Sequence, residues 1–213
     1  MADHFPLRVL CLLLCLLGWP LSGAAATPQR IISLTPHLTE LLYDIGAGDR
    51  IVATDDASDF PPEVAPLPRV ANYRSINLEA LLAQKPDLVV AWRSAQSRML
   101  APVEKLGIPV FYSEPTDFAS LATEMRSLGH LLGLTPRADE QARAYLTRLD
   151  ALAARYGEPK PLSVFYQLWY PPLTSVNNST WPGQAITLCG GRNIMAKTGA
   201  AYPQVGLEQV IKA

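Results

Sequence analysis

Short apolar runs alternate with segments of helical periodicity over residues 30–112, and this alternation is the strongest constraint on the fold. A continuous run such as Leu88–Ala91 is typical of a strand that is buried on both faces. Between such runs, apolar residues recur every three or four positions, which is the period of an amphipathic helix. The series predicts a parallel α/β sheet. The predicted strands are 30–34, 51–54, 87–91 and 108–112, the predicted helices are 36–45, 77–85 and 97–106, and residues 59–74 are predicted to form a proline-punctuated loop.

Local signals mark both ends of the first predicted helix. Thr35 is expected to cap the helix with its side chain, and Pro36 suits the first helical position because no backbone N–H is needed there. Gly46 or Gly48 is expected to end the helix.

The character of the sequence changes at residue 117. Helical periodicity runs from Phe118 to Leu132, and a second helix starts at Thr135 and ends near Tyr156. At the rise of an α-helix this second helix is about 30 Å long, which is enough to span two lobes. Strand-forming residues return at 162–167.

Two stretches of the sequence recur in the same order. Gly46–Ile51 is echoed by Gly190–Ile194, and Leu78–Leu82 is echoed by Leu207–Ile211. The repeat predicts two similarly built lobes, and the second copy stops at Ala213 before its own core strand. The predicted fold class is therefore α/β, with two small parallel-sheet lobes joined by one long rigid helix and a second lobe that is incomplete at the C-terminus. The predicted domains are an N-terminal lobe (27–116), a helical segment that contains the inter-lobe helix (117–157) and a partial C-terminal lobe (158–213).

Residues 1–26 have the pattern of a cleavable signal peptide. Arg8 precedes an apolar run at 9–17, and the segment closes with small residues up to Ala26. The run is shorter than the roughly 20 residues that a membrane-spanning helix needs. Cys15 follows leucines instead of small residues, so no lipid anchor is expected. The sequence predicts an exported protein that is cleaved near Ala26.

Charge and motifs exclude several functions. The chain has 18 Lys and Arg against 19 Asp and Glu, and the resulting net charge of -1 offers no attraction for nucleic acid. The sequence lacks a nucleophile elbow, a phosphate-binding loop and a dinucleotide fingerprint, which favours a binding protein over an enzyme. His37 and His130 have no partners at metal-ligand spacing, so no metal site is predicted, although His37 stays open as an axial ligand.

Cys189 is the only cysteine that remains once the signal peptide is removed. One interpretation is a buried thiol that packs as a small hydrophobe. The other is a disulfide with a cysteine beyond residue 213.

Six stretches spread along the chain carry a resemblance to a known family: 30–40 (RIISLTPHLTE), 58–62 (SDFPP), 77–93 (NLEALLAQKPDLVVAWR), 171–175 (PPLTS), 188–194 (LCGGRNI) and 203–209 (PQVGLEQ). They resemble the helical-backbone class of periplasmic substrate-binding proteins, which serve ABC importers of cobalamin, haem and ferric siderophores, and the resemblance is strongest to the cobalamin-binding branch. It implies two α/β lobes joined by a rigid helix, with the ligand in the cleft between them. It also implies further residues that complete the second lobe and include the disulfide partner of Cys189.

The same resemblance implies the partners of the protein. A periplasmic monomer would carry a corrinoid as a transported ligand, with no cofactor of its own, to a permease and ATPase complex in the inner membrane. Glu79 and Glu208 lie early in the two echoed helices, where the helix dipole favours a carboxylate. In the family such glutamates face arginines of the permease, so both residues are expected to dock there.

The resemblance further implies a cleft lined where strands end. A corrinoid is a large, nearly flat ring with neutral amides on its rim, so its cleft needs apolar and aromatic walls with a few donors and acceptors. Ala57 stands where cobalamin binders carry a tyrosine, which is a departure from their pattern. The expected ligand-binding residues are Tyr73, Trp92, Arg93, Trp169, Tyr170, Leu173, Trp181 and Tyr202.

Two alternatives to a corrinoid carrier stay open. A haem or ferric-siderophore carrier of the same class would use arginines for ligand carboxylates, and Arg69, Arg74 and Arg93 are available for that role. An exported α/β hydrolytic enzyme is the more remote alternative.

Overall fold

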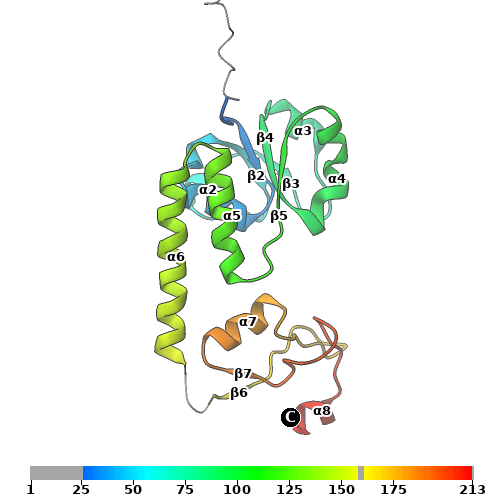
Figure 1. Ribbon diagram of the computed structural model, residues 1–213. Coiled ribbons are helices and arrows are strands. Elements are labelled where there is room, and N and C mark those ends of the chain that lie inside the picture. Colours follow the sequence, from blue (N-terminus) through cyan, green and yellow to red (C-terminus); the bar gives the residue numbers. More distant parts are fainter. Residues whose placement is uncertain (1–25, 158–160, 213) are drawn as a thin grey trace, which may run out of the picture.

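A computed structural model describes residues 26–157 and 161–212, and almost all of the predicted signal peptide lies outside these ranges. The chain forms two lobes, and a long helix runs along one side of both (Figure 1). Within the described ranges, no helix combines the length and the apolar character needed to cross a membrane.

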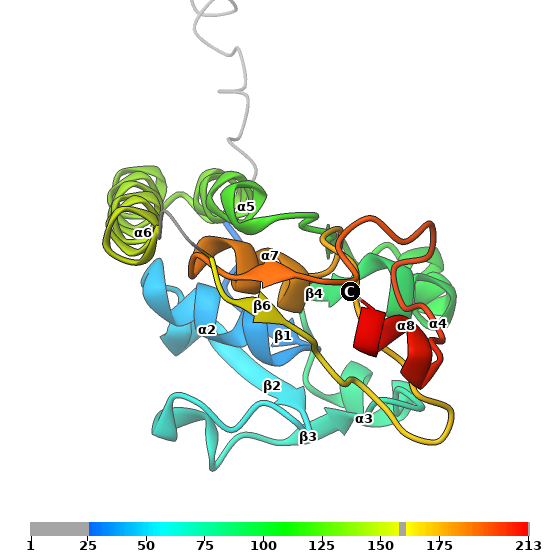
Figure 2. The same cartoon turned by 90° about the horizontal axis from the view of Figure 1, so that it is seen from below.

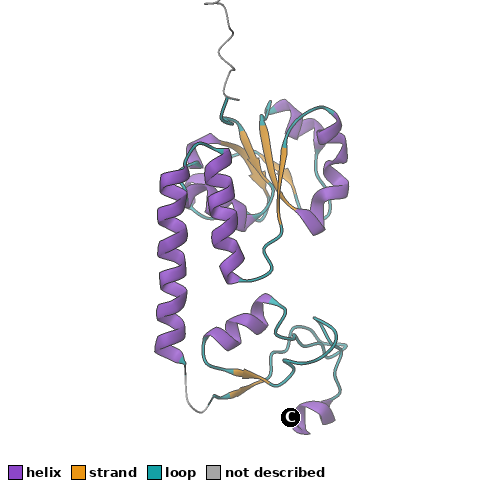
Figure 3. Ribbon diagram, in the orientation of Figure 1, coloured by secondary structure: helices purple, strands orange, loops and turns teal. Residues whose placement is uncertain are grey.

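The first lobe is built on a five-stranded sheet with the order β3-β2-β1-β4-β5, in which every neighbouring pair is parallel (Figure 3). This arrangement confirms the predicted α/β class and four of the strands. β3 was expected to be part of a loop. It is a three-residue edge strand that follows Pro68 and begins with Arg69, so it carries no apolar run that would reveal it. The strands are β1 (Ile31–Ser33), β2 (Ile51–Asp55), β3 (Arg69–Ala71), β4 (Leu88–Trp92) and β5 (Val110–Ser113).

Helices cover both faces of this sheet, which explains the continuous apolar runs in the strands. Ile31 and Val90 are buried against the helices of one face, and Ile32 and Val89 against those of the other. The first face carries α2 (Pro36–Asp44), α5 (Phe118–Leu131) and the start of α6 (Thr135–Tyr156), and the second carries α3 (Leu78–Ala83) and α4 (Arg93–Lys105). Two short 3-10 helices, η1 (Gly48–Arg50) and η2 (Pro62–Val64), lie in the connections.

The helix boundaries follow the predicted signals with two exceptions. Pro36 opens α2 and Gly46, at φ +85°, follows its end, but the Thr35 hydroxyl makes no capping hydrogen bond. The Thr35 side chain is buried, and its role in the cap is limited to the backbone carbonyl that accepts from the Thr39 amide at 3.1 Å. α4 starts at Arg93 instead of Ser97, because the chain turns into the helix directly after β4.

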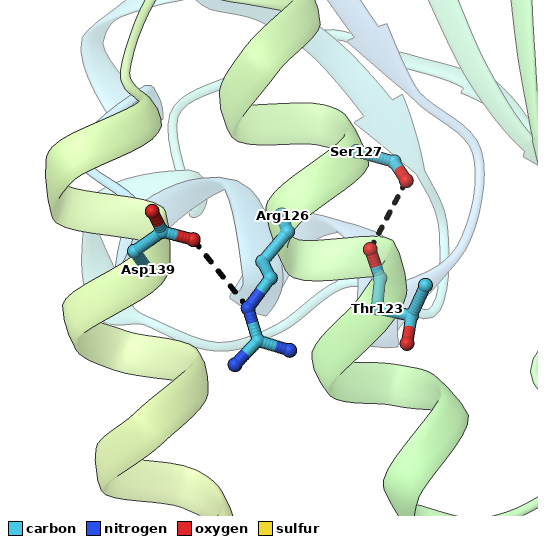
Figure 4. Close-up of polar contacts among 4 residues, drawn as sticks. All are labelled: Thr123, Arg126, Ser127 and Asp139. Atoms are coloured by element: carbon cyan, nitrogen blue, oxygen red, sulfur yellow. Dashed lines mark hydrogen bonds and ion pairs between the residues drawn. The ribbon is translucent and has the colours of Figure 1, made fainter.

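The long helix α6 is held against α5 at its beginning. Gly129 of α5 lies so close to α6 that a Cβ there would be 2.1 Å from the Cβ of Ala138. The Arg126 Nε lies 3.4 Å from an Asp139 carboxylate oxygen across the same pair of helices (Figure 4). Beyond this contact α6 continues past the first lobe toward the second one (Figure 1). Its 22 residues match the predicted inter-lobe helix.

The second lobe repeats the start of the first in smaller form. Its two short strands are parallel, and Gly190 at φ +73° follows its helix as Gly46 follows α2. Only two residues of the predicted strand 162–167 pair with a neighbour, since the neighbouring strand is equally short. The elements are β6 (Ser163–Val164), α7 (Trp181–Leu188), β7 (Arg192–Asn193) and α8 (Leu207–Lys212).

Candidate ligand-binding cleft

The carboxyl ends of the first-lobe strands meet at one edge of the sheet, and the second lobe lies against that edge. The strand order reverses at β1, so β2 and β4 leave it on opposite sides and open a crevice, which is where α/β sheets bind ligands. In the view from below, α7 and β6 overlap β1 and β4, so these second-lobe elements lie beneath the carboxyl ends of the two strands (Figures 1 and 2). A cavity of about 720 Å³ occupies this edge. Its lining includes Leu34, Asp55, Asp56, Asn72, Tyr73, Arg74, Trp92, Gln96 and Met99.

Gln96 fixes the central part of this cavity. Its side chain is 7% exposed, and its Nε2 donates to the Leu34 carbonyl at 2.8 Å while its Oε1 accepts from the Trp92 amide at 2.9 Å. One amide group therefore ties the end of β1 to the end of β4 and sets the backbone of Trp92. Sequence reasoning missed this role, because both partners are backbone groups that no motif reveals.

A tight turn after β2 forms the neighbouring wall. The Ser58 hydroxyl donates to one Asp55 carboxylate oxygen at 2.5 Å, and the Ala57 amide donates to the other at 3.2 Å. The Arg69 guanidinium clamps the turn by donating to the Asp55 and Ser58 carbonyls at 3.0 and 2.6 Å, and also to the Thr54 hydroxyl. Arg69 is thus engaged within the fold and not directed at a ligand.

Tyr73 and Arg74 stand at the mouth of the same cavity. The Asn72 side chain accepts from the Arg74 amide at 2.9 Å and holds the loop in place. The Tyr73 side chain is 84% exposed, and the Arg74 guanidinium lies 4.9 Å from the centre of its ring. The pair offers an aromatic face and a cation to whatever enters.

Trp92 also lines a second cavity, of about 320 Å³, together with His37, Pro115, Leu121 and Trp181. Trp181 belongs to the second lobe, so this cavity lies between the lobes. The rings of His37 and Trp92 meet edge to face, with their centres 6.3 Å apart. Trp92 is therefore the shared wall of two adjoining cavities, and the structure brings Trp181 to the same place.

Two contacts hold the lobes together beside this cavity. The Trp181 ring meets Phe118 edge to face at 5.1 Å between centres. The Gln184 side chain donates to the Thr116 carbonyl at 2.9 Å. The start of α7 is thus fixed to the start of α5.

The His37 imidazole is tied into the first lobe by hydrogen bonds. Its Nε2 lies 3.1 Å from the Ser113 hydroxyl, which donates to Glu124 at 2.5 Å. Burial lowers the pKa of His37, and the nearby Asp55 carboxylate opposes that shift. Burial is the larger of the two effects, so the neutral imidazole is favoured at neutral pH.

The other expected ligand residues lie outside these two cavities. The Arg93 guanidinium stacks over the Tyr112 ring at 4.8 Å. The Trp169, Tyr170 and Tyr202 side chains are exposed, and Leu173 is half-buried. These second-lobe residues sit in loops that backbone hydrogen bonds join, and the Val205 amide donates to the Leu173 carbonyl at 2.9 Å.

The two glutamates that are expected to dock on the permease, and the cysteine, are all exposed. Glu79 and Glu208 lie in the first turns of α3 and α8, and Glu208 is 3.9 Å from Lys212 one turn further on. Cys189 is exposed beside an apolar hollow that includes Ile186, so its interpretation as a buried hydrophobe is wrong. Among the described residues, no group of three or more His, Cys, Asp or Glu side chains is arranged to hold a metal ion.

Comparison with known proteins places this architecture. The family model described as periplasmic binding protein matches residues 31–213. A vitamin B12-binding protein of Vibrio campbellii is 38% identical over 203 residues, which cover 95% of this chain and 74% of that protein. Another, from Yersinia pseudotuberculosis, is 37% identical over 207 residues, covering 97% of this chain and 72% of the relative.

Solved structures agree with the sequence relatives. The periplasmic vitamin B12-binding protein BtuF of Vibrio cholerae is 37% identical and superposes with a TM-score of 0.75, over 87% of this chain and 73% of that one. The periplasmic haem-binding protein HutB of Vibrio cholerae reaches a TM-score of 0.78 over 86% of this chain and 72% of its own, but at 23% identity it shows the shared fold alone. The chain belongs to the periplasmic binding protein family.

Proposed function

We propose that this protein captures cobalamin or a related corrinoid in the periplasm and delivers it to an ABC importer. The observation that carries the proposal is the aromatic wall of Trp92, which lines the first-lobe cavity and also the adjoining cavity between the lobes, where Trp181 lines it as well. Such a wall suits a broad, flat, largely apolar ligand. Relatives at 37 and 38% identity that bear the name vitamin B12-binding protein support the same ligand.

The charges around the first cavity favour a corrinoid over haem. Haem presents carboxylates, which call for arginines that are free to pair with them. Arg69 donates its hydrogen bonds to the turn after β2, and Arg93 stacks on Tyr112 outside the cavity. Arg74 does line the cavity, but Asp55 and Asp56 line it as well. Neutral amides suit this mixture of charges better than two carboxylates do.

The position of α3 and α8 supports a docking role for Glu79 and Glu208. Both helices lie on the side of the molecule away from α6, one in each lobe (Figures 1 and 2). Exposed ion pairs contribute only about 0 to 1 kcal/mol each. The two glutamates would therefore set the geometry of docking on a permease more than the affinity.

Several further points belong to the same proposal. The protein would be a monomer without catalytic activity or a resident cofactor, exported by the signal peptide in residues 1–26, with Cys189 paired to a cysteine outside the present sequence. The domains would be those predicted from the sequence, although α5 packs with the first lobe. The exposed second-lobe residues Trp169, Tyr170 and Tyr202 and the half-buried Leu173, with Arg93, would contact the rim of the ligand.

A titration with two ligands tests the proposal. The protein without residues 1–26 is titrated calorimetrically with cyanocobalamin and with haemin, and absorbance spectra are recorded in parallel. We expect saturable one-to-one binding of cyanocobalamin and much weaker binding of haemin. Tighter binding of haemin would show that the ligand is a porphyrin and not a corrinoid. If neither ligand binds and the protein hydrolyses esters, the proposed transport function is wrong.

A further inference from the structure

Three side chains from three elements form a hydrogen-bonded chain that leads into the inter-lobe cavity. Glu124 of α5 accepts from the Glu114 amide at 2.7 Å with one oxygen and from the Ser113 hydroxyl at 2.5 Å with the other. Ser113 ends β5, and its oxygen lies 3.1 Å from Nε2 of His37 in α2. Because Ser113 and Glu124 are distant in sequence from His37, this arrangement could not be read from a motif.

The chain of hydrogen bonds fixes which nitrogen of His37 carries the proton. An ionised carboxylate only accepts, and a serine hydroxyl has one hydrogen, so that hydrogen goes to Glu124. The Ser113 oxygen must then accept from His37, which places the imidazole hydrogen on Nε2. In the neutral ring Nδ1 keeps a bare lone pair.

The His37 ring lies at the inter-lobe cavity, where the Nδ1 lone pair can accept a hydrogen bond from a ligand. His37 lines the cavity that Trp92 and Trp181 also line. Within the described part of the chain, the structure records no hydrogen bond to Nδ1. The charged groups that act on the ring are Asp55 at the end of β2 and, through Ser113, Glu124 of α5. Burial outweighs the effect of Asp55 on the pKa of His37, which keeps the lone pair available at neutral pH.

We propose that Nδ1 of His37 accepts a hydrogen bond from an amide N–H on the rim of the bound corrinoid, and that Ser113 and Glu124 are positioning residues that hold the required tautomer. This inference rests on the proposed corrinoid-binding function and narrows its ligand to rings with amides at the edge. A carboxylate at the same point would place its own lone pairs against that of the imidazole, so the contact discriminates amidated rings from carboxylate-bearing ones.

Two variants of His37 separate the hydrogen bond from mere packing. His37→Asn retains an acceptor oxygen near the position of Nδ1 but cannot titrate, whereas His37→Leu removes the acceptor. Affinity for cyanocobalamin is measured by calorimetry between about pH 8 and about pH 5, a range that spans histidine titration. Circular dichroism and melting temperature of each variant check the fold.

The expected pH profiles differ in shape. In the wild type, lowering the pH protonates Nδ1, removes the lone pair and weakens binding as the pH falls through the lowered pKa of His37. His37→Asn should bind nearly as tightly as the wild type at neutral pH and lose this acid dependence. His37→Leu should bind about tenfold more weakly at neutral pH, as expected for one hydrogen bond, with no acid dependence. Wild-type affinity in His37→Leu, or an unchanged acid limb in His37→Asn, overturns the proposal.

The positioning role has a readout that does not depend on ligand. Glu124→Gln supplies an amide that can donate to Ser113, which frees the Ser113 hydrogen for His37. Imidazole ¹⁵N chemical shifts should show the Nε2–H tautomer in the wild type and a mixture in Glu124→Gln, with weaker cyanocobalamin binding in the variant. An Nδ1–H tautomer in the wild type would defeat the proposal even if the protein binds corrinoids.

Ligand probes distinguish the remaining outcomes. The ratio of affinities for dicyanocobinamide and for dicyanocobyrinic acid, which has carboxylates in place of amides, should fall in His37→Leu. A spectral shift of aquocobalamin that requires His37 would show cobalt coordination by the imidazole and overturn the hydrogen-bond assignment. Absence of any corrinoid binding in the wild type would instead defeat the proposed function, while the tautomer measurement would still report on the Glu124 chain.

Discussion

Trp92 is the residue on which the candidate site most depends. Its side chain is 43% exposed and lines both cavities, so it contributes more to a ligand surface than to the core. We expect Trp92→Ala to weaken cyanocobalamin binding at least about 30-fold, as for a central aromatic contact. The melting temperature should change little, since a half-exposed side chain leaves no internal cavity. Calorimetry and thermal unfolding measure the two effects.

Phe60 provides a matched control for this prediction. Phe60 is 59% exposed and lies outside both cavities. Phe60→Ala should leave the affinity unchanged. A large loss of stability in Trp92→Ala with unchanged affinity would move Trp92 from the site to the core.

For single residues, the sequence predicted which side chains line the cleft better than it predicted their hydrogen-bond partners. Trp92 was expected at the cleft because it follows a core strand, and Tyr73 because it lies in a long loop; both line the cavity there. Arg69 was kept open as a partner for the carboxylates of a haem or siderophore ligand, and no role was predicted for Gln96. The hydrogen bonds of both depend on backbone groups that only the folded chain brings near. Polar side chains choose partners by geometry, which a linear pattern does not contain.

The contact between α5 and α6 decides how the long helix is anchored. Gly129 permits this contact, since an added Cβ would be 2.1 Å from that of Ala138. Gly129→Ala raises helix propensity by about 1 kcal/mol, but the overlap should cost about 1 to 3 kcal/mol. We therefore expect a net loss of unfolding free energy, measured by urea denaturation.

Gly199 serves as the control because a Cβ there would meet no atom within 4 Å. Gly199→Ala should change the unfolding free energy by less than about 0.5 kcal/mol. If Gly129→Ala were instead stabilising, the two helices would have to be further apart than this contact requires.

Helices were predictable where the periodic pattern was long. The prediction of strands failed where pairing with a neighbouring strand decides whether a strand forms. The 22 residues of α6 matched the expected helix closely. β3 has three residues and no apolar run, and residues 162–167 have the composition of a strand but find a partner for two residues only. A strand exists only as far as its neighbour extends, and the neighbour is not local in sequence.

The whole molecule is expected to respond to ligand with little movement. The lobes are joined by α6 and already touch through Phe118 with Trp181 and through Gln184 with Thr116. A helix resists the bending that a hinge of loops permits. Small-angle scattering should give the same radius of gyration with and without cyanocobalamin. A marked contraction would contradict a rigid connection.

The stiffness of α6 also affects how fast such a protein can release its ligand. A cleft that hardly opens by itself releases ligand at a rate fixed by its contacts, and tight capture then means slow escape. Fast release of the ligand would then require another protein to bind both lobes and move them apart. Because α6 joins the lobes on one side, a force that separates them would act on the other side, where α3 and α8 lie. These two helices carry Glu79 and Glu208. If Glu79 and Glu208 guide docking as proposed, the permease would hold this protein at the side opposite α6, where a force that separates the lobes would act.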